Sequence, residues 1–154
     1  MSGVGLGGLG GGWLTPAEAD VATWSRAGLA AYGLTLGPGV VHVPGGEGCP
    51  LAHVSAVLDR AAGESAGQCG PCMFGVPAVA DDVRALATGG HDPTTLPPLR
   101  SRLGLLPGRG ACRFPDGVTG YARSALRAFA MEVETHAAGR CTTASHPGRT
   151  RVDA

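Results

Sequence analysis

Three cysteines are the residues whose types and spacing best suit chemistry. Cys69 and Cys72 form a C-x-x-C step, and Cys112 follows well downstream. Small residues and Pro71 surround the first two, which leaves backbone N–H groups free to point at sulfur, as thiolate-bound iron-sulfur clusters require. We expect the chain to stay in the cytoplasm, where cysteines are thiols or metal ligands rather than disulfides. The spacing therefore predicts a shared metal site at Cys69, Cys72 and Cys112.

Helices have to bring these cysteines together. A helix is expected from near Pro50 to Gly63, ending at the cysteine loop, and a second helix follows Cys72. The clearest amphipathic pattern predicts one helix over residues 118–137, with Cys112 just before it. The apolar positions that recur at helical spacing are Leu51, Val54, Leu58 and Ala61, then Val76, Val79, Val83 and Leu86, then Val118, Tyr121, Ala125, Leu126, Phe129 and Val133. An antiparallel bundle of these helices would place the three sulfurs together, and the helix starts would favour thiolates and an anionic cluster.

The remaining segments are simpler to assign. Residues 1–12 are glycine-rich and are expected to form a loop. Thr15, followed by a proline and by Glu18, predicts the start of a helix that runs from Pro16 toward Tyr32. A short strand is expected at 40–43, closed by a Pro44-Gly45-Gly46 turn. Residues 89–110 should be mostly loop around a short helix at 99–105, and the chain beyond Gly139 a disordered tail.

Length and charge narrow the classes of function. The chain has 154 residues, enough for one core or for a compact helical domain with a fragment of another. Its formal net charge is zero and it has no basic run, which gives no electrostatic case for nucleic acid or an anionic membrane surface. The N-terminus lacks the pattern of a signal peptide, and no stretch approaches the ~18 apolar residues of a membrane span, so we expect no direct membrane insertion.

The cysteine segment and its distant partner resemble the iron-sulfur segment of the flavoprotein (F) subunit of NADH-quinone oxidoreductase (complex I), and of related NAD-linked hydrogenases and formate dehydrogenases. The family pattern is E-S-C-G-x-C-x-P-C, with a fourth cysteine further along the chain. Cys112 stands where that fourth cysteine belongs, and Ala66 is the departure, which removes one ligand. The residues that match the pattern are Glu64, Ser65, Gly67, Cys69, Pro71 and Cys72.

The resemblance extends upstream and implies a fold. The glycine-rich turn at 7–11 and the strand at 36–43 are similar to the soluble-ligand-binding, β-grasp-like domain that precedes the cluster domain in those subunits. The similarity covers residues 3–138 and the back portion of a full subunit. It implies a mainly α fold with a small antiparallel helical bundle. The division would be a partial β-grasp-like segment (1–46), a helical iron-sulfur-binding domain (47–138) and a disordered tail (139–154).

The same resemblance implies an electron-transfer module that relays electrons from a flavin- or NADH-binding partner. Cys69, Cys72 and Cys112 would hold a 4Fe-4S cluster, or a 3Fe-4S or incompletely ligated cluster because of Ala66. A 2Fe-2S thioredoxin-like subunit would be a further partner. The family's NADH and FMN site lies in an upstream domain without a counterpart here, so the chain would be at most a component of an NADH-quinone oxidoreductase-like complex. It would be cytoplasmic and peripheral to the inner membrane through that complex, and no catalytic residue is expected.

The sequence leaves open which group is the fourth ligand and which metal the cysteines bind. Glu64, Ser65 or a water would take the position that Ala66 leaves vacant, or a histidine if the fold brings one close. A C-x-x-C step with one remote cysteine also suits zinc. The competing function is therefore a non-catalytic scaffold or interaction domain whose cysteines bind zinc or no metal.

The other potential ligands are given structural roles. Cys49 is expected to be a small buried apolar residue and Cys141 an ordinary exposed thiol beyond the last helix. His53 and His136 are expected at surface positions on helices. The remaining histidines would be a strand residue, His42, and two loop residues, His91 and His146. Residues 3–8 satisfy G-x-G-x-x-G, but no strand precedes them, as a dinucleotide-binding fold requires.

Overall fold

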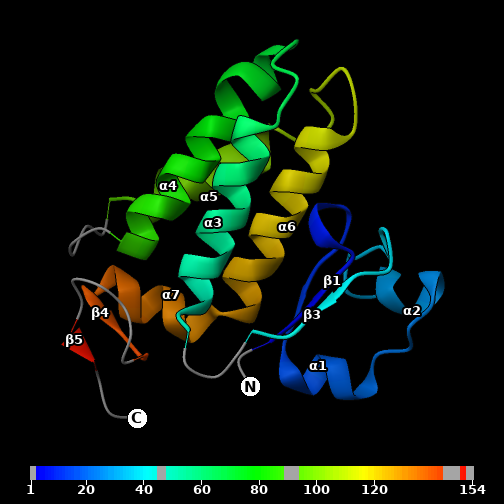
Figure 1. The fold of residues 1–154 in the computed structure, drawn as a ribbon, viewed down its shortest axis with the longest axis vertical. Coiled ribbons are helices and arrows are strands. Elements are labelled where there is room, and N and C mark those ends of the chain that lie inside the picture. Colours follow the sequence, from blue (N-terminus) through cyan, green and yellow to red (C-terminus); the bar gives the residue numbers. More distant parts are fainter. Residues whose placement is uncertain (1–2, 45–47, 89–93, 144–149, 152–154) are drawn as a thin grey trace.

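The computed structural model describes residues 3–44, 48–88, 94–143 and 150–151. Its body is a bundle of helices, which stand side by side in Figure 1 and confirm the mainly α prediction. The long helices are α3 (Pro50–Gly63), α4 (Val76–Thr88), α5 (Leu96–Leu105) and α6 (Phe114–Ala128). Within the described residues, no helix combines the length and the apolar character that crossing a bilayer requires.

The core lies where the apolar stripes predicted it. Helices α3 and α4 pack against each other, and both begin close to a proline, which is pre-organised for the first turn of a helix. The best-buried leucines and valines of this core have at most 1% of their surface exposed: Leu51, Val54, Leu58, Val76, Val79, Val83, Leu99 and Val118. Burial of each such side chain contributes roughly 1.5–3 kcal/mol relative to exposure.

A small antiparallel sheet packs beside the bundle, in strand order β2-β1-β3. The prediction of a loop over residues 1–12 is wrong, because β1 (Val4–Leu6) pairs with β2 (Gly12–Leu14). Gly5 lies so close to the Trp13 ring that an added Cβ would stand 3.2 Å from it. The glycine that weakens the strand signal is thus the one that lets the ring approach. The expected third strand is present as β3 (Val41–His42), while Gly45 and Gly46 of the expected turn lie outside the described residues.

The helix predicted from Pro16 toward Tyr32 is divided in two. Helix α1 (Pro16–Val21) has the expected capping box, in which Thr15 and Glu18 each bond the other's backbone N–H. It ends at Ala22, which is extended, and Ser25 caps a new helix, α2 (Arg26–Ala30), by accepting the N–H of Gly28 at 3.0 Å. Serine is a preferred N-cap residue, so the sequence does contain a signal for the start of this second helix.

The predicted single helix over 118–137 is also divided. Helix α6 begins earlier, at Phe114, and Phe129 breaks the run with φ −109° and ψ 32°. Phe129 is buried against Trp13, with ring centroids 4.9 Å apart, and the chain then turns into α7 (Ala130–Ala137). Beyond it, within the segment predicted as a tail, β4 (Arg140–Cys141) pairs in parallel with β5 (Thr150–Arg151).

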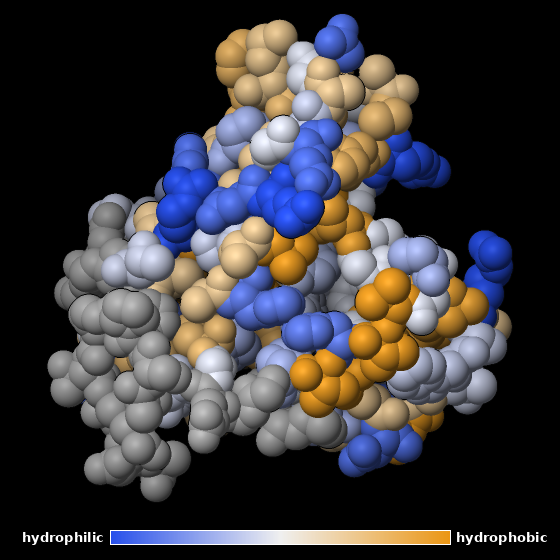
Figure 2. Space-filling view, in the orientation of Figure 1, coloured by the Kyte–Doolittle hydropathy of each residue, from blue (hydrophilic) through white to orange (hydrophobic). Residues whose placement is uncertain are grey.

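The surface over β3 is apolar. Figure 2 shows hydrophobic atoms gathered on the side of the molecule where β3 lies, and three valines there are about half exposed: Val40, Val41 and Val43. Strand β3 pairs with β1 along one edge.

Candidate metal sites

The C-x-x-C step lies at the end of the bundle that α3 reaches with its C-terminus (Figure 1). Cys69 is half-buried, and Cys72 is buried within a π-helical turn, η2 (Pro71–Gly75), that leads into α4. Such turns are frequent at functional sites. Gly67 has φ +61°, a conformation that favours glycine, and a Cβ on Gly70 would meet only open space. The loop is therefore tightly turned, with room beside it.

The segment that contains Cys112 packs against this loop. The backbone N–H of Ala111, the residue before Cys112, donates a hydrogen bond to the sulfur of Cys69. A second contact joins the same two segments, because Gly75 lies so close to Leu106 that an added Cβ would stand 2.3 Å from its side chain. Cys112 itself is exposed. The fold thus brings the C-x-x-C step and the α5–α6 connection to one end of the bundle.

The surroundings of Cys69 suit a thiolate. Backbone N–H groups of Ala111 and Cys72 donate to its sulfur and hold the pKa of the Cys69 thiol below its usual value. Donated N–H bonds of this kind stabilise sulfur that is bound to iron. The three thiols lie on two adjoining segments, but among the described residues their sulfur atoms are not gathered into a ready-made group of metal ligands.

The side chains proposed for the fourth ligand position have other partners. Glu64 is exposed and pairs with Arg60 across 3.0 Å, one turn back on α3. The Ser65 hydroxyl accepts the N–H of Gly67 at 3.3 Å. Ala66 is exposed, so a longer side chain at that position would meet solvent rather than the core. A water molecule would therefore take the fourth ligand position without displacing the contacts of Glu64 or Ser65.

An open cavity of about 450 Å³ adjoins the cysteine loop. Phe74, two residues after Cys72, is 70% exposed beside it, and its neighbour Met73 is 54% exposed. The cavity is lined by Gly70, Pro71, Phe74, Gly75, Ala78, Arg102, Leu105, Leu106 and Arg109. The surface next to Cys72 is thus apolar and accessible, with two arginines at its margin.

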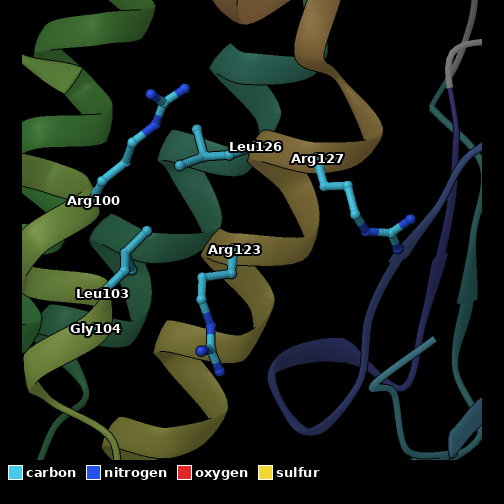
Figure 3. A pocket seen from close by; sticks show the side chains of 6 residues that line it. All are labelled: Arg100, Leu103, Gly104, Arg123, Leu126 and Arg127. Atoms are coloured by element: carbon cyan, nitrogen blue, oxygen red, sulfur yellow. The ribbon is translucent and has the colours of Figure 1, made fainter. Parts of the chain in front are cut away.

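A second open cavity, of about 400 Å³, lies between α5 and α6 and is flanked by arginines (Figure 3). Arg100 and Arg123 extend from the two helices, while Arg127 turns toward the sheet. There Arg127 pairs with Glu18 and donates to the Trp13 carbonyl at 3.1 Å. Arg127 therefore holds the sheet to α6.

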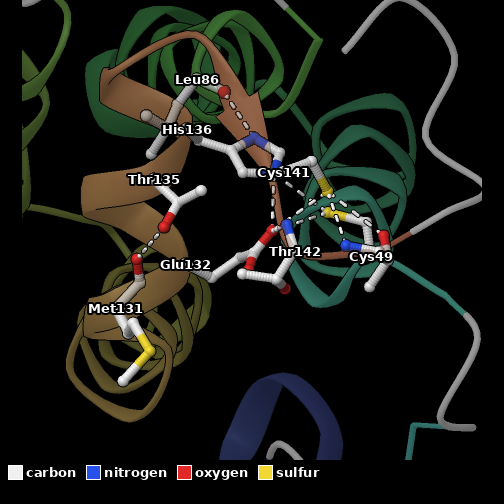
Figure 4. A network of polar contacts seen from close by, with 9 residues as sticks. Cys49, Leu86, Met131, Glu132, Thr135, His136, Cys141 and Thr142 are labelled. Carbon is white, nitrogen blue, oxygen red and sulfur yellow. Dashed lines mark hydrogen bonds and ion pairs between the residues drawn. The ribbon is translucent and has the colours of Figure 1, made fainter. Parts of the chain in front are cut away.

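Four other side chains meet at the opposite end of α3 (Figures 1 and 4). Cys49 precedes α3, Glu132 and His136 lie one turn apart on α7, and Cys141 ends β4. One ligand atom from each of the four lies within 4.8 Å of all the others, and all four residues are buried. The chain therefore has a second group of metal-binding residue types.

Two predictions about this group are wrong and one is incomplete. His136, expected at the surface, is 1% exposed, and Cys141, expected to be an exposed thiol, is 0% exposed. The break at Phe129 turns α7 so that His136 faces inward, and β4 folds back onto the helix. Cys49 is buried as predicted, but its sulfur lies 3.4 Å from Nε2 of His136 and so has a polar neighbour. Burial and the nearby Cys141 raise the pKa of the Cys49 thiol to about 12.

The other histidines follow their predictions only in part. His42 is in β3 as expected, and His53 on α3 is half-buried, with its ring stacked on that of His42 at a centroid distance of 4.2 Å. Burial, and to a lesser degree His42, lower the pKa of His53. His91 and His146 lie outside the described residues.

Comparison with known proteins adds the family. A family model described as NADH-ubiquinone oxidoreductase-F iron-sulfur binding region matches residues 52–136. That range includes Cys69, Cys72 and Cys112, and it spans more than half of the chain. A search of curated proteins found no match. The chain belongs to the NADH-ubiquinone oxidoreductase-F iron-sulfur binding region family, whose cofactor is a 4Fe-4S cluster.

Proposed function

We propose that this chain is an electron-transfer module in which Cys69, Cys72 and Cys112 hold the iron-sulfur cluster. The observation that supports this ligand set is the hydrogen bond from the Ala111 N–H to the Cys69 sulfur. It joins the C-x-x-C loop to the segment that contains Cys112. Water, rather than Glu64 or Ser65, completes the coordination where Ala66 supplies no thiolate, because both of those side chains have other partners.

When bound, the cluster accepts and returns one electron at a time. In the proposed relay, one electron leaves a reduced flavin on a partner protein and later passes to an acceptor such as a 2Fe-2S subunit. No bond of the chain is made or broken. The three thiolates would hold the iron, and the N–H groups of Ala111 and Cys72 would stabilise the negative charge on sulfur. In this proposal the chain works in the cytoplasm and is held at the membrane periphery through its complex.

The exposed apolar side chains beside Cys72 support contact with a protein partner. Met73 and Phe74 directly follow Cys72 and are 54% and 70% exposed. An aromatic side chain surrounded by accessible apolar surface is typical of the centre of a protein–protein interface. The partner that we assign to this surface is the flavin-bearing protein, because it would bring the donor close to the proposed ligands.

Anaerobic purification followed by EPR after reduction tests the proposal. Free FMN, photoreduced with a sacrificial electron donor, serves as the probe for the partner's flavin. We expect acid-labile sulfide in the purified protein, and an iron-sulfur EPR signal that reduced FMN elicits. Cys69→Ser and Cys72→Ser should each remove most of the iron and sulfide, while Ser101→Ala, an exposed change on α5, should remove neither. A correctly folded protein without acid-labile sulfide would favour the scaffold alternative.

A further inference from the structure

Four buried side chains have the donor atoms and the spacing of a closed metal site: Cys49, Glu132, His136 and Cys141. Oε1 of Glu132 lies 2.9 Å from Nε2 of His136, 3.1 Å from Sγ of Cys141 and 4.0 Å from Sγ of Cys49. Sγ of Cys49 lies 3.4 Å from Nε2 of His136. Ligands around a tetrahedral zinc, with bonds of ~2.0–2.3 Å, stand about 3.3–3.8 Å from one another. These four separations, from 2.9 to 4.0 Å, lie around that range, and every pair of ligand atoms lies within 4.8 Å.

The orientation of His136 is that of a ligand. Its Nδ1 lies 3.1 Å from the carbonyl oxygen of Leu86. A carbonyl only accepts, so Nδ1 has to be the donor, and the ring faces the other three side chains with Nε2. A histidine that binds metal through one nitrogen while the other donates to a backbone carbonyl is the common arrangement in protein metal sites.

The same orientation argues against a catalytic cysteine–histidine–carboxylate relay. In such a relay one ring nitrogen faces the nucleophile and the other faces the carboxylate. Here a single atom, Nε2 of His136, faces both Cys49 and Glu132. All four residues are also less than 9% exposed, which is typical of a structural site rather than a catalytic one. The ligand atoms of the four side chains instead converge on one point, as they would around a metal ion.

Further contacts orient two of the three anionic ligands, Glu132 and Cys141. The hydroxyl of Thr142 donates to Oε2 of Glu132, which leaves Oε1 directed at the other three side chains (Figure 4). The backbone N–H of Thr143 lies 3.4 Å from Sγ of Cys141 and donates to it. Outer contacts of this kind fix the direction of ligands and tune their basicity.

We propose that Cys49, Glu132, His136 and Cys141 bind one structural zinc ion. Two thiolates, an imidazole and a carboxylate are all zinc ligands, and four protein ligands with no open position are typical of a structural site. Burying two thiolates and a carboxylate together without a cation would be costly, and zinc removes that cost. The site lies at the end of α3 opposite to the C-x-x-C loop, so it is separate from the proposed cluster.

The zinc would tie the start of α3 to α7 and β4, which follow about 80 residues later in the sequence. It would join the start of α3, one face of α7 and the strand β4, and would hold the chain after Ala137 against the bundle. Metal bound only in the folded state adds its binding free energy to folding. Removing it should therefore release β4 and lower the melting temperature of the whole bundle.

Metal analysis of the anaerobically purified full chain tests this site separately from the proposed cluster. The decisive variant has Cys69→Ser, Cys72→Ser and Cys112→Ser combined, so that the only cysteines left are Cys49 and Cys141. We expect about one zinc per chain in this variant, with no acid-labile sulfide. If the cysteines of the C-x-x-C loop hold the zinc instead, the triple variant will contain none, which overturns the proposal.

Single substitutions in the triple-variant background give matched comparisons. Glu132→Gln and Cys141→Ser should release the zinc and lower the melting temperature by on the order of 10 °C. The matched control is Glu134→Gln, an exposed position on the same helix, which should change neither. Retention of zinc in both ligand variants would contradict the assignment.

Cobalt substitution keeps the test independent of whether these variants fold. The apo form of the triple variant, prepared with a chelator and titrated with Co²⁺, should show the visible bands of tetrahedral cobalt and thiolate-to-cobalt charge transfer. Absence of these bands would overturn the site. A disulfide between Cys49 and Cys141, found by mass mapping of protein alkylated at lysis, would also overturn it.

Discussion

The backbone N–H of Ala111 donates a hydrogen bond to the sulfur of Cys69. The two residues belong to separate segments, because Cys69 precedes η2 and Ala111 precedes α6. The bond places the residue next to Cys112 against the C-x-x-C loop, and it is the kind of contact that stabilises a thiolate bound to iron. The proposed cluster therefore depends on how the α5–α6 connection packs against η2.

Gly75→Ala tests that packing. The added methyl group would collide with Leu106, whose side chain would have to move, and the α5–α6 connection would be displaced from the cysteine loop. We expect a loss of about 1–3 kcal/mol in unfolding free energy and a lower iron content. Urea unfolding and iron analysis measure the two effects.

The control for that substitution is Gly104→Ala on α5, where an added Cβ meets only open space. Alanine favours the helix over glycine by roughly 0.5–1 kcal/mol, so this variant should be as stable as the parent or more stable. Equal behaviour of the two alanine variants would contradict the predicted role of the Gly75–Leu106 contact.

Ala66→Cys should make the cluster more robust. It restores the thiol that the family pattern has at this position, and Ala66 is exposed, so the larger side chain meets no steric conflict. We expect slower loss of visible absorbance in air than in the parent protein. Ala56→Cys, which adds an exposed cysteine on α3, is the matched control and should leave the rate of loss unchanged. An Ala66→Cys protein as oxygen-sensitive as its parent would argue against iron at this loop.

Stability should depend on pH through Glu18. Burial alone would raise the pKa of its carboxyl group, but the Thr15 N–H and the Arg127 guanidinium outweigh burial and lower the pKa below 4.5. A lowered folded-state pKa means that the ionised form stabilises the fold above pH 4.5, and that this contribution disappears as the pH falls through the folded pKa. Glu18→Gln should cost on the order of 1 kcal/mol at pH 7.

The comparison that checks this prediction is urea unfolding of the parent and of Glu18→Gln from pH 7 down to pH 3. The difference in unfolding free energy should shrink as the pH falls below 4.5, because protonation removes the same charge that the substitution removes. A difference that stays constant over this range would show that the Glu18 charge has no part in holding the sheet to α6.

Ser124 joins the sheet to the bundle through a buried hydrogen bond. Its hydroxyl accepts the N–H of Trp13 at 3.0 Å and donates to the Tyr121 carbonyl at 2.8 Å. Ser124→Ala would leave the buried Trp13 N–H without this acceptor, at a cost of about 1–3 kcal/mol. Thermal unfolding measures the loss. The exposed change Ser101→Ala should stay within about 0.5 kcal/mol of the parent, and an equally small effect of Ser124→Ala would refute the structural role.

The helices nearest the proposed cluster could be predicted from local pattern. Helix α3 has the expected bounds because a proline at its start and apolar residues at helical spacing agree with its packing. The sheet was missed because Gly5 and Gly12 have no side chains that mark a strand. Gly12 in fact needs to be small, since an added Cβ would stand 2.4 Å from the Ser124 hydroxyl. That requirement is tertiary and has no local signal.

The second group of ligands was missed for a similar reason. His136 and Cys141 face inward only because Phe129 is drawn into the core beside Trp13 and interrupts the helical run. The sequence does contain a partial signal, since Glu132 and His136 stand four residues apart and therefore share a helix face. Cys49 lies far from them in the sequence, and only the packing of α3 against α7 brings it near.

Acid-labile sulfide is the measurement that tests the central claim most directly, because zinc at either end of α3 contributes none. The full chain, purified and reconstituted anaerobically with iron and sulfide, should contain both in the ratio of an iron-sulfur cluster. Cys112→Ser should lose most of both, while keeping the zinc proposed for the other site. A folded parent protein without sulfide, or a Cys112→Ser variant with undiminished sulfide, would contradict the assignment of Cys69, Cys72 and Cys112 as the cluster ligands.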